Sequence, residues 1–191
     1  PLGGGERFFS TSGHSSGNIT VGASFSAPAG ITATVERLAN GTYRITERSG
    51  MKYVFESVNG TATDTSQKAR LLSISDKNGN TLTLDYSAAC GNNLCTVTDG
   101  LNRSLTFTYM GNRISQISDW SGRSWQYTVD GNGDLTTFKN PLAVAGTQPA
   151  VTYQYYTAAD GVKLAHAMKQ TQLPRGNGMR FEYYANGRVF R

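Results

Sequence analysis

Apolar and polar residues alternate along much of the chain, and short polar stretches interrupt the alternation at regular intervals. The clearest case is DKNGNTLTLDY at 76–86, and similar phrases follow as DGLNRSLTFTY at 99–109 and DWSGRSWQYTV at 119–129. A period of two places successive side chains on opposite faces of a strand. The pattern therefore predicts a succession of β-strands joined by turns.

The repeat aligns on Asp76, Asp99 and Asp119, which are 23 and 20 residues apart (99 − 76 and 119 − 99). The positions six, eight and ten residues after each Asp are apolar or aromatic: Leu82, Leu84 and Tyr86, then Leu105, Phe107 and Tyr109, then Trp125, Tyr127 and Val129. The positions five and two residues before each Asp are also apolar: Leu71 and Ile74, Leu94 and Val97, Ile114 and Ile117. Each unit is therefore expected to be a strand, a turn and a strand.

The turns carry their own chemistry. The Asp is expected to cap backbone amides with its side chain, as Asp commonly does at the start of a turn. Gly79 and Gly122 occupy the same place in their turns, and Asn102 replaces them in the third. Gly and, after it, Asn are the residues that most readily adopt the left-handed backbone conformation.

Looser copies flank these three units, so that six copies cover the chain from about Thr42 onward. The earlier copy aligns Glu47 and Gly50, and the later ones lie at 151–155 and 176–183. We therefore expect repeats over 42–191, cut short at the C-terminal end because ANGRVF matches only the opening of a unit. Residues 6–41 are expected to be a lead-in β segment, with strands at 7–10 and 19–25 and a hairpin over Asn40-Gly41. The opening PLGGG, residues 1–5, resembles a tag remnant with a Gly linker.

Helix is nearly absent from these expectations. The one candidate segment is Ala159 to Gln170, where Asp160 would cap a short helix. Val162, Leu164 and Met168 also fit strand alternation, so the segment remains open between the two.

The repeated units resemble the YD repeats of Rhs-family proteins, as seen in NRISQISDWSGRSWQYT, ARLLSISDKNGNTLTLDY and YYANGRV. The resemblance covers about three quarters of the chain. It implies an all-β fold in which repeated β-hairpins form a continuous twisted antiparallel sheet, here an open segment of a spiral shell. In that family the shell encloses a C-terminal toxin domain, and related modules occur in adhesion receptors. NPLAV at 140–144 lacks the acidic residue and the Gly of that family's self-cleavage segment. The resemblance therefore assigns self-cleavage to no residue of this chain.

The composition of the chain limits the kinds of partner that we expect it to bind. The chain is 38% hydrophobic, 10% aromatic and 16% charged, with a net charge of +5 that is not concentrated in any run of Lys or Arg. We therefore expect no nucleic-acid binding. No stretch approaches the roughly 18 apolar residues of a membrane-spanning helix. No cofactor is implied.

The two cysteines, Cys90 and Cys95, lie in CGNNLC between two expected strands. No further Cys or His is near enough in sequence to suggest a metal site. We favour a disulfide across a short hairpin over two free thiols. A disulfide in turn favours an oxidising, extracytoplasmic location.

Four patterns suggest other chemistry, and each has a simpler explanation. GHSSG at 13–17 fits the nucleophile motif of hydrolases through Ser15, with His166 as the base, but strand-like sequence follows it instead of a helix. DKNGN and DGNGD at 130–134 resemble the start of a calcium loop but lack its later Gly and Glu. The glycosylation pattern occurs at Asn18, Asn40, Asn59 and Asn102, where turn preference explains it. Trp120, Trp125, Tyr155 and Tyr156 would suit a sugar platform, although Trp125 and Tyr155 occupy apolar repeat positions.

The sequence thus favours a non-enzymatic scaffold without catalytic, cofactor or metal residues, part of a shell around a toxin cargo. The alternative is an extracellular module that binds glycan or protein, and a hydrolase is the weakest hypothesis. The expected partners are the other repeats and the C-terminal cargo of a longer parent protein. Unpaired strand edges also suggest self-association. The expected location is secreted or at the cell surface, with cytoplasmic storage before export.

Overall fold

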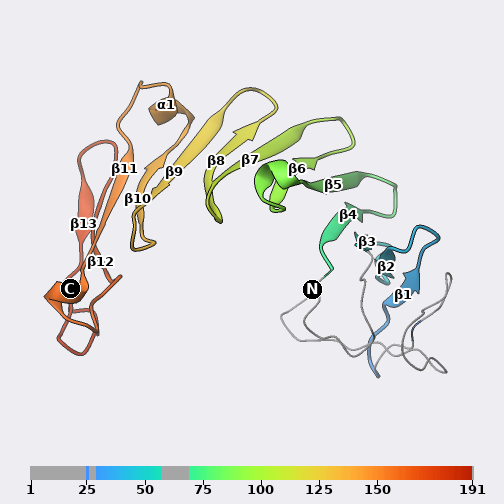
Figure 1. Ribbon diagram of the computed structural model, residues 1–191, viewed down its shortest axis with the longest axis horizontal. Helices are drawn as coiled ribbons and strands as arrows, with labels where there is room; N and C mark the ends of the chain where they lie inside the picture. The colour runs from blue at the N-terminus through green and yellow to red at the C-terminus, as the bar shows by residue number, and fades with distance from the viewer. Residues whose placement is uncertain (1–24, 26–28, 57–68, 191) are drawn as a thin grey trace. The chain divides into compact units, whose positions relative to one another are not determined.

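The computed structural model describes residues 25, 29–56 and 69–190, and the regular secondary structure of this part of the chain is almost all β-strand (Figure 1). Thirteen strands form one antiparallel sheet in which each strand is bonded to the next in sequence, from β1 to β13. The sheet is open, because β1 and β13 are its two ends. The predicted fold class, an all-β array of repeated hairpins, is confirmed. Residues 1–5, which were predicted to be a tag remnant, both early strand candidates except Phe25, and Ser15, Asn18 and Asn59 lie outside the described residues.

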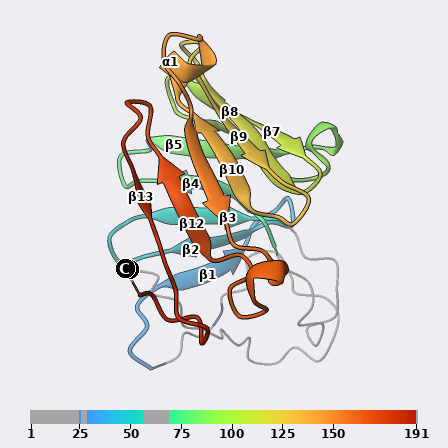
Figure 2. The same ribbon diagram turned by 90° about the vertical axis from the view of Figure 1, so that its left-hand side faces the viewer.

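The chain divides into two compact units, one within 1–85 and 96–103 and the other within 86–95 and 104–191. The first unit holds four complete strands and all but the last residue of a fifth: β1 (Thr34–Arg37), β2 (Tyr43–Thr46), β3 (Lys52–Phe55), β4 (Leu71–Ser75) and β5 (Thr81–Tyr86). Figure 2 shows β1, β2 and β3 as adjacent ribbons. Residues of β6 (Leu94–Thr98) belong to both units.

The second unit contains seven strands of its own, which lie side by side in chain order (Figure 1). They are β7 (Ser104–Met110), β8 (Arg113–Asp119), β9 (Ser124–Val129), β10 (Leu135–Lys139), β11 (Val151–Tyr155), β12 (Met168–Gln172) and β13 (Gly178–Arg180).

The pairing register repeats with the sequence. In the hairpin of Asp76, the residue two before the Asp, Ile74, pairs with Leu82, six after it. The hairpin of Asp119 uses the same offsets for Ile117 and Trp125. The looser copies do so as well, with Ile45 opposite Tyr53 and Thr171 opposite Met179. A shared register follows from shared turns, because the turn fixes which residues face each other.

Residues that pair across neighbouring strands lie on the same face of the sheet. The rows of paired residues give each unit one apolar face and one polar face. In the first unit, one row runs through Val35, Ile45, Tyr53, Ile74 and Leu82, and a polar row on the other face runs through Thr34, Thr46, Lys52, Ser75 and Thr81. In the second unit, the apolar rows are Phe107, Ile117 and Trp125, and Tyr127, Phe138 and Val151. The polar rows there are Thr108, Gln116, Gln126 and Lys139, and Thr128, Thr137, Thr152 and Gln172.

The sheet has little enclosed core. No described side chain is less than 2% exposed, and the buried hydrophobic residues are Val35, Cys95 and Ala143. Leu82 and Leu105 lie at the strand positions predicted for them but remain 41% and 40% exposed. The apolar rows are thus stabilised mainly by neighbours within the sheet, such as the rings of Tyr127 and Phe138, whose centroids are 5.4 Å apart.

Helical structure is confined to short turns in the described residues. The segment from Ala159 to Gln170, for which helix and strand were both left open, begins in a 3-10 turn, η2 (Ala158–Asp160), and enters the strand β12 at Met168. A short helix, α1 (Pro141–Val144), occurs at the end of β10. Asn140 caps it by accepting from the Ala143 amide at 2.9 Å, and Pro suits the first helical position. No helix in the described ranges has the length and apolarity needed to cross a membrane.

Candidate functional site

One five-residue turn recurs throughout both units. In each copy the first residue donates its amide to the carbonyl of the fifth, and the fourth donates its amide to the carbonyl of the first. The fourth residue always has a positive φ, between 60° and 97°. Among the described residues, eight turns share this pattern, and they begin at Leu38, Glu47, Asp76, Asp99, Asp119, Asp130, Leu173 and Tyr184.

The positive φ at the fourth position explains why Gly or Asn occurs there in the repeat. Gly79 and Gly122 have φ of 89° and 85°, and Asn102 has φ of 60°. Asn102 is thus one of the few described residues other than Gly in the left-handed region. The hairpin over Asn40-Gly41 also has this five-residue form, with Gly41 at φ 84°.

Four of the turns begin with Asp, and the carboxylate caps the turn from within. In each, one carboxylate oxygen accepts from the backbone amides of the third and fifth residues, at 2.8 to 3.0 Å. These are Asp76, Asp99, Asp119 and Asp130. The side chain thereby satisfies two amides that strand pairing leaves without partners.

In three of these turns the fifth residue closes the ring with its own side chain. Asn80 Nδ2 donates to Asp76 at 2.7 Å, and Arg103 Nε and Arg123 Nε donate to Asp99 and Asp119 at 2.8 Å. The Asp119 side chain is only 4% exposed. The signal for this contact was present in the sequence as Asp followed four residues later by Asn or Arg, but it was not recognised.

The capping hydrogen bonds lower the pKa of each Asp. The Asn80 side chain is the main cause at Asp76, and the Arg103 backbone amide is the main cause at Asp99. Shielding from solvent raises the pKa of Asp119, but hydrogen bonds from Ser121 and Arg123 outweigh it and bring the pKa to about 2. These carboxylates are held ionised and bound to their own turns, so they are poorly suited to proton transfer near neutral pH.

The Asp130 turn departs from this scheme, because its fifth residue is a second acid, Asp134. Asp134 is paired instead with His166, whose Nδ1 lies 3.0 and 3.1 Å from its two carboxylate oxygens. His166 has φ of 66°, in the left-handed region. Arg113, at the start of β8, also reaches this turn and donates to the Gly133 carbonyl at 2.5 Å.

A groove of about 630 Å³ opens beside the Asp130 turn, within the second unit. Acidic, basic and aromatic side chains line it together, among them Asp130, Asn132, Tyr155, Tyr156 and Lys169. The Lys169 Nζ lies 5.1 Å from the centre of the Tyr156 ring. Burial raises the pKa of Tyr155, and the charges of Asp134 and Asp130 raise it further.

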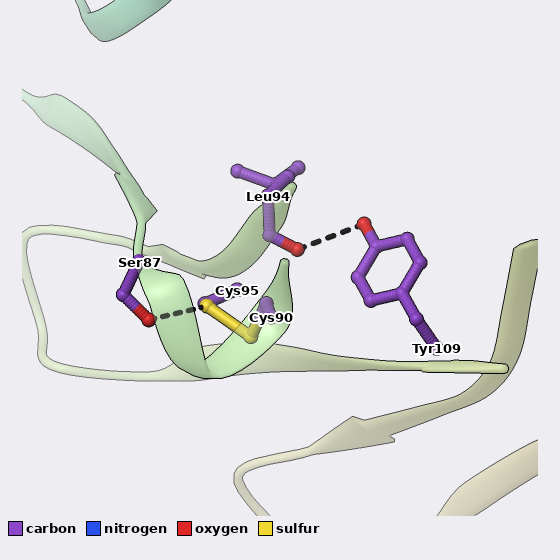
Figure 3. The surroundings of a disulfide bond; sticks show 5 residues. All are labelled: Ser87, Cys90, Leu94, Cys95 and Tyr109. Carbon is purple, nitrogen blue, oxygen red and sulfur yellow. Dashed lines mark hydrogen bonds between the residues drawn. A yellow bond between two sulfur atoms is a disulfide. The ribbon is translucent and has the colours of Figure 1, made fainter. Parts of the chain in front are cut away.

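The cysteines form a disulfide, Cys90–Cys95, with their Cα atoms 5.7 Å apart (Figure 3). Cys90 ends a 3-10 turn, η1 (Ala88–Cys90), and Cys95 lies in β6, so the bond ties the link between strands to a strand. Ser87 Oγ lies 3.0 Å from the Cys95 sulfur, and the Tyr109 hydroxyl donates to the Leu94 carbonyl at 2.9 Å. The disulfide thus ties the link to β6, and the Tyr109 hydroxyl connects β7 with the first residue of β6.

The repeat residues predicted for the strands lie where the pattern placed them. Leu82, Leu84 and Tyr86 belong to β5, the set of Leu105, Phe107 and Tyr109 to β7, and Trp125 and Tyr127 to β9. Trp125 and Tyr155 are half-buried, while Trp120 is 62% exposed in its turn.

The remaining candidates do not assemble into a reactive site among the described residues. No group of three or more His, Cys, Asp or Glu side chains there is arranged to hold a metal ion, so DKNGN and DGNGD gain no calcium-binding partners. His166 pairs with Asp134, while Ser15 lies outside the described part. Asn40 and Asn102 both lie in five-residue turns. Nothing in the sequence pointed to the Asp134–His166 contact, because 32 residues separate the two.

Comparison with known proteins yields no match to any family model and no significant match to a curated protein.

Proposed function

We propose that the chain is a non-enzymatic scaffold, a segment of a YD-type wall that encloses a C-terminal toxin cargo within a longer parent protein. The observation that carries the proposal is the eightfold recurrence of one five-residue turn. A constant turn gives a constant register, and hairpins with a constant register can be added side by side without limit. Such an array builds area, which an enclosing wall requires.

The two faces of each unit support the same function. The polar rows of the second unit consist of Thr, Gln and Lys side chains that water can solvate, while the apolar rows hold aromatic and aliphatic ones. Antiparallel sheets commonly keep one face solvated and the other packed. A wall with two unlike faces can meet solvent on one side and pack other residues of a parent protein on the other.

The use of the polar side chains argues for a structural role. The Asp residues of the repeat are bound to their own backbone amides and to Asn or Arg at the fifth position. A general acid or base needs a free group with a pKa near the working pH. These carboxylates, with lowered pKa values, serve to hold turns in place.

The proposed location is outside the cytoplasm after export. The Cys90–Cys95 disulfide supports it, since disulfides persist in oxidising compartments. A second candidate function, an adhesion module that binds glycan or protein, is favoured by one observation, the mixed polar and aromatic groove beside the Asp130 turn.

Limited proteolysis of the parent protein tests the scaffold. In Gly178→Ala, a Cβ would overlap the Thr171 carbonyl oxygen and separate β12 from β13. Gly131→Ala is the matched control, because Gly131 has open space around it. We expect the C-terminal domain to resist protease in the wild type and in Gly131→Ala, and to be cleaved in Gly178→Ala. Equal cleavage in all three would refute the enclosing role.

A further inference from the structure

The groove of the second unit differs from the other hollows of the described chain in what it brings together. Three tyrosines of β11 and the following loop, Tyr153, Tyr155 and Tyr156, line it together with the acids and amide of the Asp130 turn. Its volume of about 630 Å³ falls within the range of small-molecule sites, roughly 300 to 1,000 Å³. It therefore has the size and the mixed lining of a binding site.

The Asp130 turn has a free carboxylate acceptor, whereas the same acceptor is occupied in the other three turns that begin with Asp. Asp76, Asp99 and Asp119 each bind the fifth side chain with their second carboxylate oxygen. At Asp130, Oδ1 accepts from two amides, and no described residue donates to Oδ2. The Asn132 side chain also lines the groove without a hydrogen bond to the described residues. A carboxylate with an unused acceptor and a side-chain amide thus lie together in the lining of the groove.

The groove contains side chains of both charges. The Asp134 carboxylate is paired with His166, and the Lys169 ammonium lies over the Tyr156 ring. A cation would meet Lys169, and an anion would meet Asp130 and Asp134. The groove is therefore better suited to a neutral polar ligand than to an ion.

Tyr155 adds a half-buried ring and a hydroxyl beside these acids. Burial and the nearby Asp134 and Asp130 raise the pKa of this hydroxyl, so it remains a protonated donor at physiological pH. Aromatic residues with a polar tip present an apolar surface and a hydrogen-bonding group at one place. A sugar ring has the complementary character, with hydroxyl groups around an apolar C–H face.

We propose that this groove binds a neutral saccharide, with Asp130 and Asn132 receiving its hydroxyl groups and Tyr155 contributing ring surface and a donor. The proposal is independent of the enclosing role, because saccharide binding requires neither a cargo nor a closed shell. Protease protection of the cargo and saccharide binding can therefore succeed or fail separately.

The test uses the isotope-labelled chain and NMR titration with a panel of neutral saccharides: glucose, galactose, mannose, N-acetylglucosamine, lactose, cellobiose and chitobiose. We expect at least one to shift the backbone amides of Asn132, Asp134 and His166 in a saturable manner. Sialic acid and calcium chloride are charged probes that should bind more weakly or not at all. Absence of saturable shifts with every neutral saccharide, or stronger binding of calcium at the same amides, would overturn the proposal.

Matched variants locate the binding. Asn132→Ala should weaken the affinity about fivefold, the loss expected for one hydrogen bond. Asn78→Ala changes the same residue at the same position of the Asp76 turn, which does not line the groove, and should leave affinity unchanged. Asp130→Asn keeps an oxygen to cap the turn and should also weaken binding. Equal affinity in Asn132→Ala and Asn78→Ala, with both variants folded by circular dichroism, would refute this site.

Discussion

The two turns at the ends of β9 share a backbone and differ in how they are closed. Asp119 and Asp130 both accept from the amides of their third and fifth residues, and both turns place a Gly with positive φ at the fourth position. The Asp119 turn is completed by Arg123 within the same five residues. The Asp130 turn is completed from outside, by Arg113 and His166.

This difference separates local from tertiary structure. The Asp119 turn contains all the partners it needs, so it should form whenever its own hairpin forms. The Asp130 turn connects the start of β8 with the loop between β11 and β12. It should therefore respond to changes in those segments, and it couples three successive hairpins of the second unit.

Replacing the Gly at the fourth position by Ala should give the largest difference in stability between the Asp119 and Asp130 turns. Gly122→Ala should cost about 1–2 kcal/mol, because an L-residue is strained at positive φ and nothing else lies within 4 Å of its Cβ. In Gly133→Ala, the Cβ would come within 2.6 Å of Arg113 Nη2. Displacing Arg113 should cost about 1 kcal/mol more through its lost hydrogen bond. Chemical denaturation measures both, and equal losses would show that Arg113 does not hold the Asp130 turn.

The Cys90–Cys95 disulfide closes its link with a covalent bond, so its removal can be compared with changes in the turns that hydrogen bonds close. Replacing both cysteines, Cys90→Ala with Cys95→Ala, should destabilise by about 2 kcal/mol, the loop-entropy value for so short a ring. Calorimetry should show a Tm lower by about 4–8 °C for a chain of this size. Ser87→Ala keeps the disulfide and is the control. A Tm unchanged in the double variant would mean that η1 and the Tyr109 contact suffice to close this end.

The sequence predicted what local structure determines. Alternation placed Leu82, Phe107 and Tyr127 in strands, and Asp followed three residues later by Gly or Asn identified the turns. The short helix at Pro141–Val144 was not predicted, although Asn140 followed by Pro141 is a recognised helix start.

The groove could not be predicted, and the reason is physical. Its residues come from the Asp130 turn, from β10, β11 and β12, and from the loop before β12, and no fixed spacing relates them. DGNGD had the correct local explanation as a turn, but the partner of its last residue, His166, depends on how the hairpins lie next to each other. Residue patterns reveal a turn, whereas long-range pairs require the fold.

Acid titration should reveal a smaller effect, the pH-dependent contribution of the Asp119 turn to stability. The pKa of Asp119 is lowered to about 2, below the value of about 3.9 for an unfolded Asp. Its contribution to stability is therefore present above pH 4 and is lost as the pH falls toward 2. Asp119→Asn should lower Tm at pH 7 and reduce the loss of Tm between pH 4 and pH 2. An unchanged pH profile in this variant would show that the hydrogen bonds to Asp119 do not stabilise the fold.

The smallest effect is expected from exchanging the natural residues at the fourth position. Asn102 adopts φ of 60° in the Asp99 turn, so Asn already fulfils the role that Gly122 has in the Asp119 turn. Gly122→Asn should therefore change stability by less than about 0.5 kcal/mol, because Asn tolerates the left-handed region and the site has open space. The same change at Gly133 places a side chain against Arg113 and should be clearly destabilising. If Gly122→Asn costs as much as Gly133→Asn, the two turns are not distinguished by their partners, and the contrast between local and tertiary closure fails.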